Sequence, residues 1–565
     1  MRRLLVGVLV LGTACSLPLP KDVKTVGEVQ PGVQQPGGLK VFPPLPQKTD
    51  TPVKVVEGFL RAQANSDNSH AIARAFLTDE ESASWDDQAE VQVYTAESRQ
   101  TDQVVTGPTA TVVVRSQVIG DVAPDGRYVG ARRQVVERYT LLDTSSGWRL
   151  TNVPNGLRLT AADLFRAYQP RDVYYLAPKR SAGDQPHLVP DRVYLPADGD
   201  LATVLVRRAL RPPSSALNGT VTTGVPQDVT LAARSVRHEA DGVVAVDLSG
   251  PVTGFSPAQR EALAARLVWT LRGDPSFRGL RLLDEGKRVS VPGVGNVEDS
   301  GAFDAYDPEG LGLDPPYFFV SGRRLRASLP SLPLATSKLT TQDVRSGGIA
   351  VDGVAVTTNR TQLAVLDSDA VRVGALASGD YPVVARGAGL SSLSWGSGAF
   401  GLWLVQRGVG VVRVDPARPG LQRVNLVGEL PGTPSALSMS RDGSRAAVVA
   451  AGRLFVLRVE AVNGVPRLVD PTELAPGDLV GVRDVAWATP TELVVIRRLT
   501  SGPASVLRLP VDGSTSTVVQ ASGLTPVALA AAGSALLVQS GTSLYALGST
   551  AALRQASGTL PNYPG

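Results

Sequence analysis

Cysteine and histidine are nearly absent from this chain of 565 residues. The single cysteine is Cys15, and the three histidines are His70, His187 and His238. One cysteine cannot form an intrachain disulfide, so packing must hold the fold together. Structural metal sites combine several Cys or His ligands at close spacing, and these scattered histidines exclude such a site. We therefore expect no metal-binding and no cofactor-binding residues.

A strong charge bias is also lacking. The formal net charge is +4, and removal of a leader containing Arg2 and Arg3 would leave +2. Of the 56 Lys and Arg residues only 8 are lysine, and none follows Lys338, which indicates a coding bias rather than a function. Proteins that bind nucleic acid carry a concentrated basic footprint. The composition therefore excludes nucleic acid as a partner.

Apolar runs long enough to span a membrane are missing as well, since a spanning helix needs about 20 residues. A short run, Leu4–Leu11, follows Arg2 and Arg3 and precedes Gly12-Thr13-Ala14-Cys15. A charged start, a short apolar stretch and small residues before a cleavage point are typical of a secretory signal. The pattern predicts a signal peptide over residues 1–14.

The residues around Cys15 resemble the bacterial lipobox. Thr13, Ala14 and Cys15 match its last three places, while Gly12 stands where leucine is usual. The resemblance implies cleavage between Ala14 and Cys15, and a lipidated Cys15 that carries S-diacylglycerol and an N-palmitoyl group. Several acyl chains anchor a protein stably to a membrane. We therefore expect a protein held at the extracytoplasmic face of the cell membrane; an ordinary secretory signal with an incidental cysteine is the alternative.

Residues 15–51 are rich in proline and glycine and predict a semi-extended tether. A small α+β domain is expected over 52–165. Thr51-Pro52 is typical of a helix start, a second helix is expected near 69–77, and period-two strands follow from Val91. Two helices before an antiparallel sheet resemble the nuclear-transport-factor-2-like (NTF2-like) group. Such folds often contain a pocket, but without an evident acid–base pair a binding or structural role is favoured.

Residues 170–292 predict a second α+β domain. Its VYYL stretch ends at Leu176, a helix runs into Arg211-Pro212-Pro213, and VVAVDLSG covers Val243–Gly250. Together with the helix that ends at Leu271, these features resemble the GerMN domain, which implies a binding module. Asp247 is a lone carboxylate at a strand end, where a turn or cap role is favoured over catalysis.

A linker is expected over 293–314 and an all-β domain over 315–565. Five short apolar segments recur at steps of 39 to 48 residues, which suits the four-stranded blades of a β-propeller. Their anchors are Val354–Val356, Leu393–Trp395, Leu437–Met439, Val485–Trp487 and Val527–Leu529. The predicted fold is therefore multidomain, with two small α+β domains followed by a propeller of five or six blades. A pair of β-sandwiches is the alternative. The hairpin Tyr317–Ser328 is expected to complete a blade with strands near Leu544–Leu547.

Catalytic motifs are not found: the chain has no G-x-S-x-G elbow, no P-loop and no H-E-x-x-H. Carboxylates are the remaining candidates for chemistry at a propeller face, namely Asp367, Asp369, Asp442 and Asp484. Asp442 already fits an Asp-Gly turn. No histidine follows His238, so a propeller site that depends on imidazole is excluded. We expect no catalytic residues and no enzymatic activity.

The whole domain order, with VVAVDLSG and the later SRDGSRAAVV, resembles the actinobacterial lipoprotein LpqB family. The resemblance implies that the chain modulates a sensor histidine kinase similar to MtrB, through the kinase's extracellular domain, and so influences MtrA, cell division and envelope homeostasis. One alternative is a lipoprotein that binds a cell-wall polymer such as peptidoglycan or glycan. Exposed Trp395, Trp403 and Trp487 would favour it, although all three lie in strand-like runs typical of a core. A propeller hydrolase or lyase is the second alternative.

Overall fold

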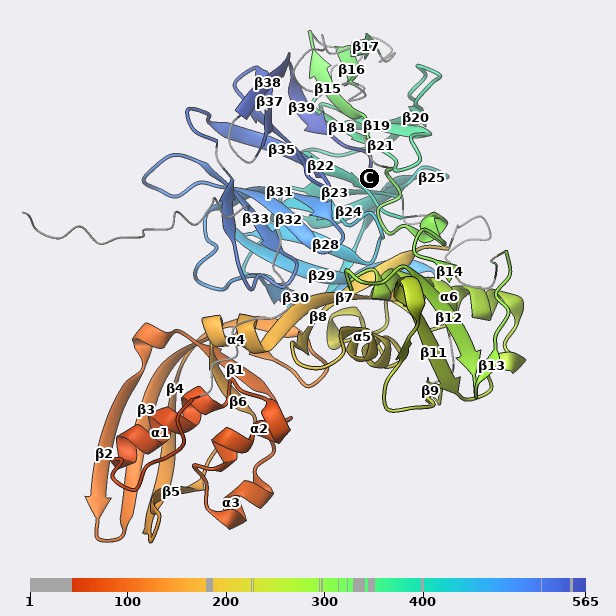
Figure 1. Cartoon of the computed structure of the whole chain (residues 1–565). Coiled ribbons are helices and arrows are strands. Elements are labelled where there is room, and N and C mark those ends of the chain that lie inside the picture. Colours follow the sequence, from red (N-terminus) through yellow and green to blue (C-terminus); the bar gives the residue numbers. More distant parts are fainter. Residues whose placement is uncertain are drawn as a thin grey trace, which may run out of the picture. The chain divides into compact units, whose positions relative to one another are not determined.

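The computed structural model describes residues 43–565 apart from 179–185, 225, 227, 294, 296–297, 313–314, 323, 329–340, 344–350, 398–400, 520 and 549–551. These residues fall within one compact unit. Its elements form two α+β domains followed by a domain made of strands, as Figure 1 shows. The predicted fold class is confirmed. Cys15 and its cleavage point lie outside the described residues.

The first domain packs helices against a mainly antiparallel sheet of order β5-β4-β3-β1-β6, with β2 paired to β3. Its helices are α1 (Pro52–Ala62), α2 (Asp67–Arg74), α3 (Asp79–Ser84) and α4 (Ala161–Ala167), with the short 3-10 turn η1 (Ala96–Ser98). Its strands are β1 (Val91–Tyr94), β2 (Gln100–Thr106), β3 (Thr109–Val122), β4 (Tyr128–Thr144), β5 (Gly147–Asn152) and β6 (Leu157–Thr160).

The start of α1 shows why this sequence forms a helix there. The Thr51 side chain accepts a hydrogen bond from the Lys54 N–H, and Pro52 fills the first turn, where no N–H partner is needed. Val55, Val56 and Phe59 then face the sheet and are fully buried. The α3 helix was not predicted, because its six residues contain no apolar period.

The second domain begins with a separate two-stranded ribbon, β7 (Tyr168–Leu176) and β8 (Leu188–Pro196). Its main sheet has the order β10-β11-β12-β13, with β9 paired to β11 and β14 paired to β12. The strands are β9 (Thr230–Leu231), β10 (Arg237–His238), β11 (Val243–Ser249), β12 (Gly279–Asp284), β13 (Lys287–Arg288) and β14 (Glu298–Asp299). Three single 3-10 turns accompany them: η2 (Ser215–Leu217), η3 (Ala240–Gly242) and η4 (Val252–Gly254).

Two helices cover this sheet, α5 (Leu201–Ala209) and α6 (Pro257–Leu271). A reciprocal capping box starts α6, in which the Ser256 hydroxyl accepts from Gln259 N–H and the Gln259 side chain accepts from Ser256 N–H. Both helices lie where the sequence predicted them, because their apolar spacing and caps agree.

The predicted linker at 293–314 is partly built into the second domain. Its β14 strand extends the sheet beside β12, and η5 (Asp304–Tyr306) follows. The buried Tyr306 donates to a Glu261 carboxylate oxygen at 3.0 Å, and Trp269 Nε1–H donates to Phe303 O at 2.9 Å. The segment therefore packs on α6 rather than running free.

Six sheets of the described residues make up the last domain. The first contains β17-β16-β15-β39: β15 (Tyr317–Ser321), β16 (Arg324–Ser328), β17 (Thr341–Asp343) and β39 (Thr559–Asn562). The second and third are β18 (Gly353–Val356), β19 (Gln362–Asp367), β20 (Ala370–Ala375), β21 (Val383–Arg386), and β22 (Leu390–Trp395), β23 (Leu402–Gln406), β24 (Gly410–Asp415), β25 (Arg418–Arg423). The fourth is β26 (Asn425–Val427), β27 (Pro434–Met439), β28 (Arg445–Ala450), β29 (Arg453–Val462) and β30 (Val465–Glu473). The fifth and sixth are β31 (Val482–Thr489), β32 (Glu492–Arg497), β33 (Ser505–Pro510), β34 (Thr517–Val519), and β35 (Pro526–Ala532), β36 (Ala535–Ser540), β37 (Ser543–Leu547), β38 (Ala552–Ser557).

All five predicted anchors fall in innermost strands, namely β18, β22, β27, β31 and β35. Successive innermost strands contact each other, and β39 contacts both β35 and β18, so the ring closes. The predicted closing partner of the Tyr317–Ser328 hairpin was wrong. β15 pairs with β39 near the end of the sequence, whereas Leu544–Leu547 lies in β37, already paired with β36 and β38.

Hydrogen bonds join each sheet to the next around the axis. Four side chains bond to backbone groups of an innermost strand in the neighbouring sheet. Trp395 Nε1–H donates to Ala355 O, and Trp487 Nε1–H donates to Ser438 O. Ser394 Oγ accepts from Met439 N–H, and Asp484 Oδ2 accepts from Leu529 N–H. Asn562 and Gln539 complete the ring on either side of β39, accepting from Val356 N–H and Leu560 N–H. These six contacts satisfy buried backbone groups and fix the register between blades.

Candidate functional site: an axial funnel and an interdomain junction

A funnel runs along the propeller axis, with a volume of about 480 Å³ and a lining drawn from all six sheets. The beginnings of the innermost strands are solvent-exposed at Ser391, Ser435 and Arg483, whereas their ends are buried, as at Met439 and Trp487. The funnel is therefore open at one end and closed at the other. Its volume lies within the 300–1,000 Å³ typical of ligand sites.

Arg441 closes the narrow end. Its guanidinium donates to Pro564 O at 3.1 Å, to Trp487 O at 3.2 Å, to Ala488 O at 3.4 Å and to Ala531 O. Burial lowers the pKa of Arg441 to about 10, so the side chain stays charged at neutral pH. Because four carbonyl oxygens already accept hydrogen bonds from this cation, it crosslinks neighbouring blades and is not available to bind an anion.

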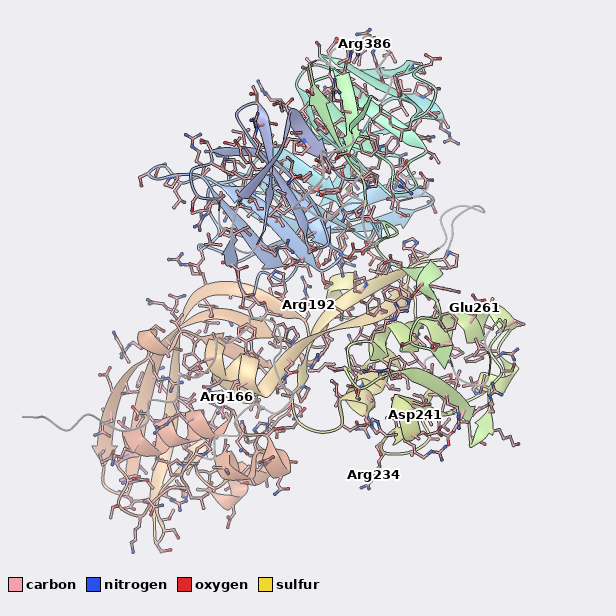
Figure 2. All side chains as sticks on the ribbon, turned by 45° about the horizontal axis from the view of Figure 1, so that its top comes forward. Arg166, Arg192, Arg234, Asp241, Glu261 and Arg386 are labelled. Atoms are coloured by element: carbon pink, nitrogen blue, oxygen red, sulfur yellow. The ribbon has the colours of Figure 1, made fainter. Side chains whose placement is uncertain are left out.

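Of the four candidate carboxylates, the structure brings only Asp484 to the axis. Asp367 forms a partly buried pair with Arg372 Nε at 2.9 Å, and Asp369 forms an exposed pair with Arg386 Nη1 at 3.0 Å. Figure 2 shows Arg386 at the outer edge of the domain. Asp442 is buried in its turn and accepts from Ser444 N–H and the Ser440 hydroxyl. The turn role predicted for Asp442 is confirmed.

Asp484 is largely surrounded by protein, and burial raises its pKa from 3.8 to about 6. Hydrogen bonds from Leu529 N–H at 3.1 Å and Val485 N–H at 3.0 Å oppose this shift without cancelling it.

The raised pKa of Asp484 predicts a pH-dependent stability. The folded chain binds this proton more tightly than the unfolded chain, so the stability it contributes is complete below the unfolded pKa and is lost as the pH rises through about 6. Asparagine does not ionise. We therefore subtract the unfolding free energy of the native protein from that of Asp484→Asn at each pH. This difference should be larger at pH 7 than at pH 4 by about 1–3 kcal/mol. Urea titrations at both pH values measure this; a constant or falling difference contradicts it, and Asp369→Asn is the exposed control.

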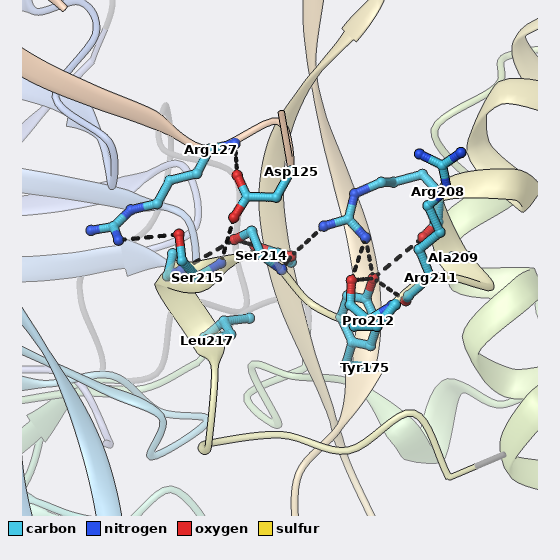
Figure 3. Close-up of polar contacts among 12 residues, drawn as sticks. Asp125, Arg127, Tyr175, Arg208, Ala209, Arg211, Pro212, Ser214, Ser215 and Leu217 are labelled. Atoms are coloured by element: carbon cyan, nitrogen blue, oxygen red, sulfur yellow. Dashed lines mark hydrogen bonds and ion pairs between the residues drawn. The ribbon is translucent and has the colours of Figure 1, made fainter. Parts of the chain in front are cut away.

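The second site is the junction where the domains meet, and beside it lies Asp191 on β8 of the second domain, which is fully buried. Its oxygens accept from Arg208 Nη2 at 3.2 Å and from the Ser214 N–H and hydroxyl, both at 2.7 Å. Burial raises the pKa of Asp191, and the charge of Arg208 opposes the rise. Arg208 also donates to Tyr175 Oη at 2.6 Å and to Pro212 O at 2.7 Å, as Figure 3 shows.

This junction is tied to the first domain. Asp125, in the turn between β3 and β4, accepts from Ser215 N–H at 2.8 Å and from Arg127 N–H at 3.0 Å (Figure 3). Arg127 then reaches Thr472 Oγ1 on β30 of the propeller at 2.8 Å. One short turn of the first domain therefore touches both of the other domains.

The closed end of the propeller is tied to the ribbon. Arg445 donates to Pro190 O, His187 Nε2 lies 3.0 Å from Asp442 O, and Thr491 Oγ1 donates to Asp172 at 3.0 Å. Figure 2 shows Arg192 where the ribbon meets its neighbours, and this side chain pairs with Asp172 and Asp512, each at 3.5 Å. These hydrogen bonds and ion pairs position the ribbon against the propeller, and the buried Arg445 would lose a hydrogen-bond acceptor if the two were separated.

Sequence reasoning missed this junction. A usable signal was present: Asp191 and Arg192 interrupt an apolar strand at Leu188–Leu195, and Arg208 follows an apolar helix face. A charged residue inside a buried run needs a partner. Nothing local identified that partner, because Arg208 and Ser214 lie 17 and 23 residues further along the chain.

The first domain contains one acid–base contact that the sequence did not predict. His70 Nε2 lies 3.9 Å from Asp87 Oδ2, and burial lowers the pKa of His70. Arg74 approaches the same carboxylate at 3.4 Å while its guanidinium covers the Trp85 ring. The carboxylate therefore already serves an arginine, and the cluster holds α2 against the following loop.

The structure also tests the predictions made for Asp247 and for three tryptophans. Asp247 Oδ1 accepts from Gly286 N–H at 2.9 Å, which confirms its turn role. Trp395, Trp403 and Trp487 are 6%, 0% and 3% exposed, so they belong to the core and form no aromatic rim.

Among the described residues no cluster of three His, Cys, Asp or Glu side chains is arranged to hold a metal ion, and no helix is long and apolar enough to cross a membrane.

The fold and the two sites define a class of protein: a six-sheet propeller joined to a GerMN-type domain and to a further small α+β domain. Family models match each part. Residues 45–165 match "Lipoprotein LpqB, N-terminal domain", residues 172–290 match a "Sporulation and spore germination" domain, and residues 335–559 match "Lipoprotein LpqB beta-propeller domain". The chain belongs to the LpqB lipoprotein family.

Full-length relatives agree with this assignment. The chain is 27% identical to Lipoprotein LpqB of Thermobifida fusca, with 98% of both chains covered. It is 26% identical to Lipoprotein LpqB of Mycobacterium tuberculosis, with 93% of this chain and 90% of that protein covered. These relatives are named as lipoproteins and not as enzymes.

Two solved structures are similar to parts of this chain. TolB from Acinetobacter baumannii is 12% identical with a TM-score of 0.35, covering 45% of this chain and 68% of that one. The first GerMN domain of GerM from Bacillus subtilis is 19% identical with a TM-score of 0.19, covering 23% of this chain and 96% of that one.

Proposed function

We propose that this protein is a membrane-anchored lipoprotein of the extracytoplasmic face that modulates a sensor histidine kinase resembling MtrB, and thereby affects cell division and envelope homeostasis. The observation that supports this most is the similarity to LpqB lipoproteins along 98% of the chain. The kinase role is what resemblance to that family implies.

The proposed mechanism needs no chemistry from this chain. Lipid on Cys15 would confine the protein beside the membrane and raise its effective concentration at the extracellular domain of the kinase. To shift the kinase between two states, the protein must bind one state more tightly than the other. The hydrogen bonds between the domains, from Ser215 to Asp125, from Arg127 to Thr472 and from Arg445 to Pro190, support this mechanism, because they would present the domains to the kinase as one body.

Co-purification tests the proposal. The full chain in detergent is mixed with the isolated extracellular domain of the kinase, and the matching domain of an unrelated sensor kinase is the control. We expect the chain to retain the extracellular domain of the MtrB-like kinase and not that of the unrelated kinase. With the full kinase, we expect the rate of kinase phosphorylation to change. If none of the three domains of this protein makes detectable contact with the kinase's extracellular domain, the proposal is refuted.

A further inference from the structure

The funnel of the propeller has the size and lining of a ligand-binding site. We infer that it binds the amino-terminal end of an extended polypeptide, whose ammonium group reaches Asp484 and whose backbone lies along the innermost strands. This site belongs to the propeller alone and does not depend on the proposed kinase contact.

The strand edges suit such a ligand. Each of β18, β22, β27, β31 and β35 is paired on one side only, with β19, β23, β28, β32 and β36. Their other edges face the axis, and the bonds between blades use some of their N–H and C=O groups at the closed end. Towards the opening, edges of this kind can pair with a ligand that alternates amide donors and acceptors, as an extended peptide does.

The partly buried carboxylate in the lining favours the amino end of the peptide. Two further charged residues line the funnel, Asp352 and Arg483, and both are solvent-exposed, where salt screens them. Asp484 lines the funnel as a carboxylate whose recorded partners among the described residues are two backbone N–H groups. Its oxygens retain lone pairs that can accept from an ammonium group. The cation at the closed end, Arg441, already donates to four carbonyl oxygens, so an anionic group gains little there.

The lining argues against a sugar. Sugar sites usually offer an open aromatic face, but the aromatic residues that line the funnel, Trp487 and Tyr563, are only 3% and 7% exposed. The hydrogen bonds that described propeller residues make to the ribbon come from loops at the closed end, at Asp442, Arg445 and Thr491, and so lie away from the opening. A chain end from another protein can therefore enter.

The test uses the full chain in detergent and an equimolar pool of random hexapeptides, half with free amino termini and half N-acetylated. Retained peptides are identified by mass spectrometry. We expect free-amine peptides to be retained at least about tenfold more strongly than acetylated ones. Asp484→Asn should abolish this preference, while Asp369→Asn, a carboxylate lost from the exposed edge, should preserve it.

A second variant separates binding from folding. Ala528→Phe places a ring in the funnel at a lining position and should reduce retention of all peptides, with thermal unfolding monitored to confirm a folded domain. Equal retention of free and acetylated peptides, preference for a disaccharide added as competitor, or unchanged retention by a folded Ala528→Phe variant would each overturn the inference.

Discussion

Replacing Arg208 by methionine is expected to destabilise the folded protein by about 3–5 kcal/mol. The change leaves Asp191 as a carboxylate with no exposed surface and without its only ion-pair partner among the described residues. The bonds to Tyr175 and Pro212 are lost as well. Since domains are typically stable by only 5–15 kcal/mol, much of the margin would disappear. Urea denaturation followed by circular dichroism measures the loss.

A double variant isolates the reason. Asp191→Asn combined with Arg208→Met removes both charges and should be clearly more stable than Arg208→Met alone, because no bare charge remains buried. Arg166→Met is the surface control, since Arg166 pairs with Asp163 while 41% exposed and should lose less than about 1 kcal/mol. If Arg208→Met loses no more than Arg166→Met, the junction does not act as described.

Replacing Cys15 by alanine is expected to move the protein from the membrane fraction to the soluble fraction. Alanine has no thiol to receive diacylglycerol, and each buried methylene of the acyl chains contributes about 0.8 kcal/mol to anchoring. Membrane fractionation and immunoblotting measure the shift, and mass spectrometry of the native amino terminus reports the lipid directly.

The neighbouring residue provides the control for this experiment. Ser16→Ala changes one side chain beyond the predicted cleavage point and should leave the protein in the membrane fraction. If Cys15→Ala remains with the membrane as before, lipid on Cys15 is not the anchor.

Most of the propeller could be predicted from the sequence, because its signals are local. Alternating apolar residues, Asp-Gly and Ala-Gly turns and a repeat of about 40–50 residues specify hairpins that pair with their immediate neighbours. The strand that closes the ring could not be found in this way. β39 pairs with β15 across more than two hundred residues, and Thr559–Asn562 has no distinctive apolar period of its own.

The site residues divide in the same manner. Asp442 and Asp247 were predicted correctly because their turn partners lie nearby in the chain or in the same sheet. Among four equivalent candidates, the sequence could not tell that Asp484 alone faces the axis, since that depends on where β31 stands in the ring. The partners of Asp191 were equally hidden.

By itself, then, the sequence determined the fold class, the domain order and the blade repeat of this protein, and it predicted the address signalled by Cys15, since each follows from residues close together in the chain. Tertiary structure alone decided how the ring closes at β39, that Arg441 links three parts of the ring at its closed end, and that Asp191 and Arg208 pair inside the second domain. The physical reason is burial: which charges lose water, and which partners compensate them, is settled only when distant segments pack together.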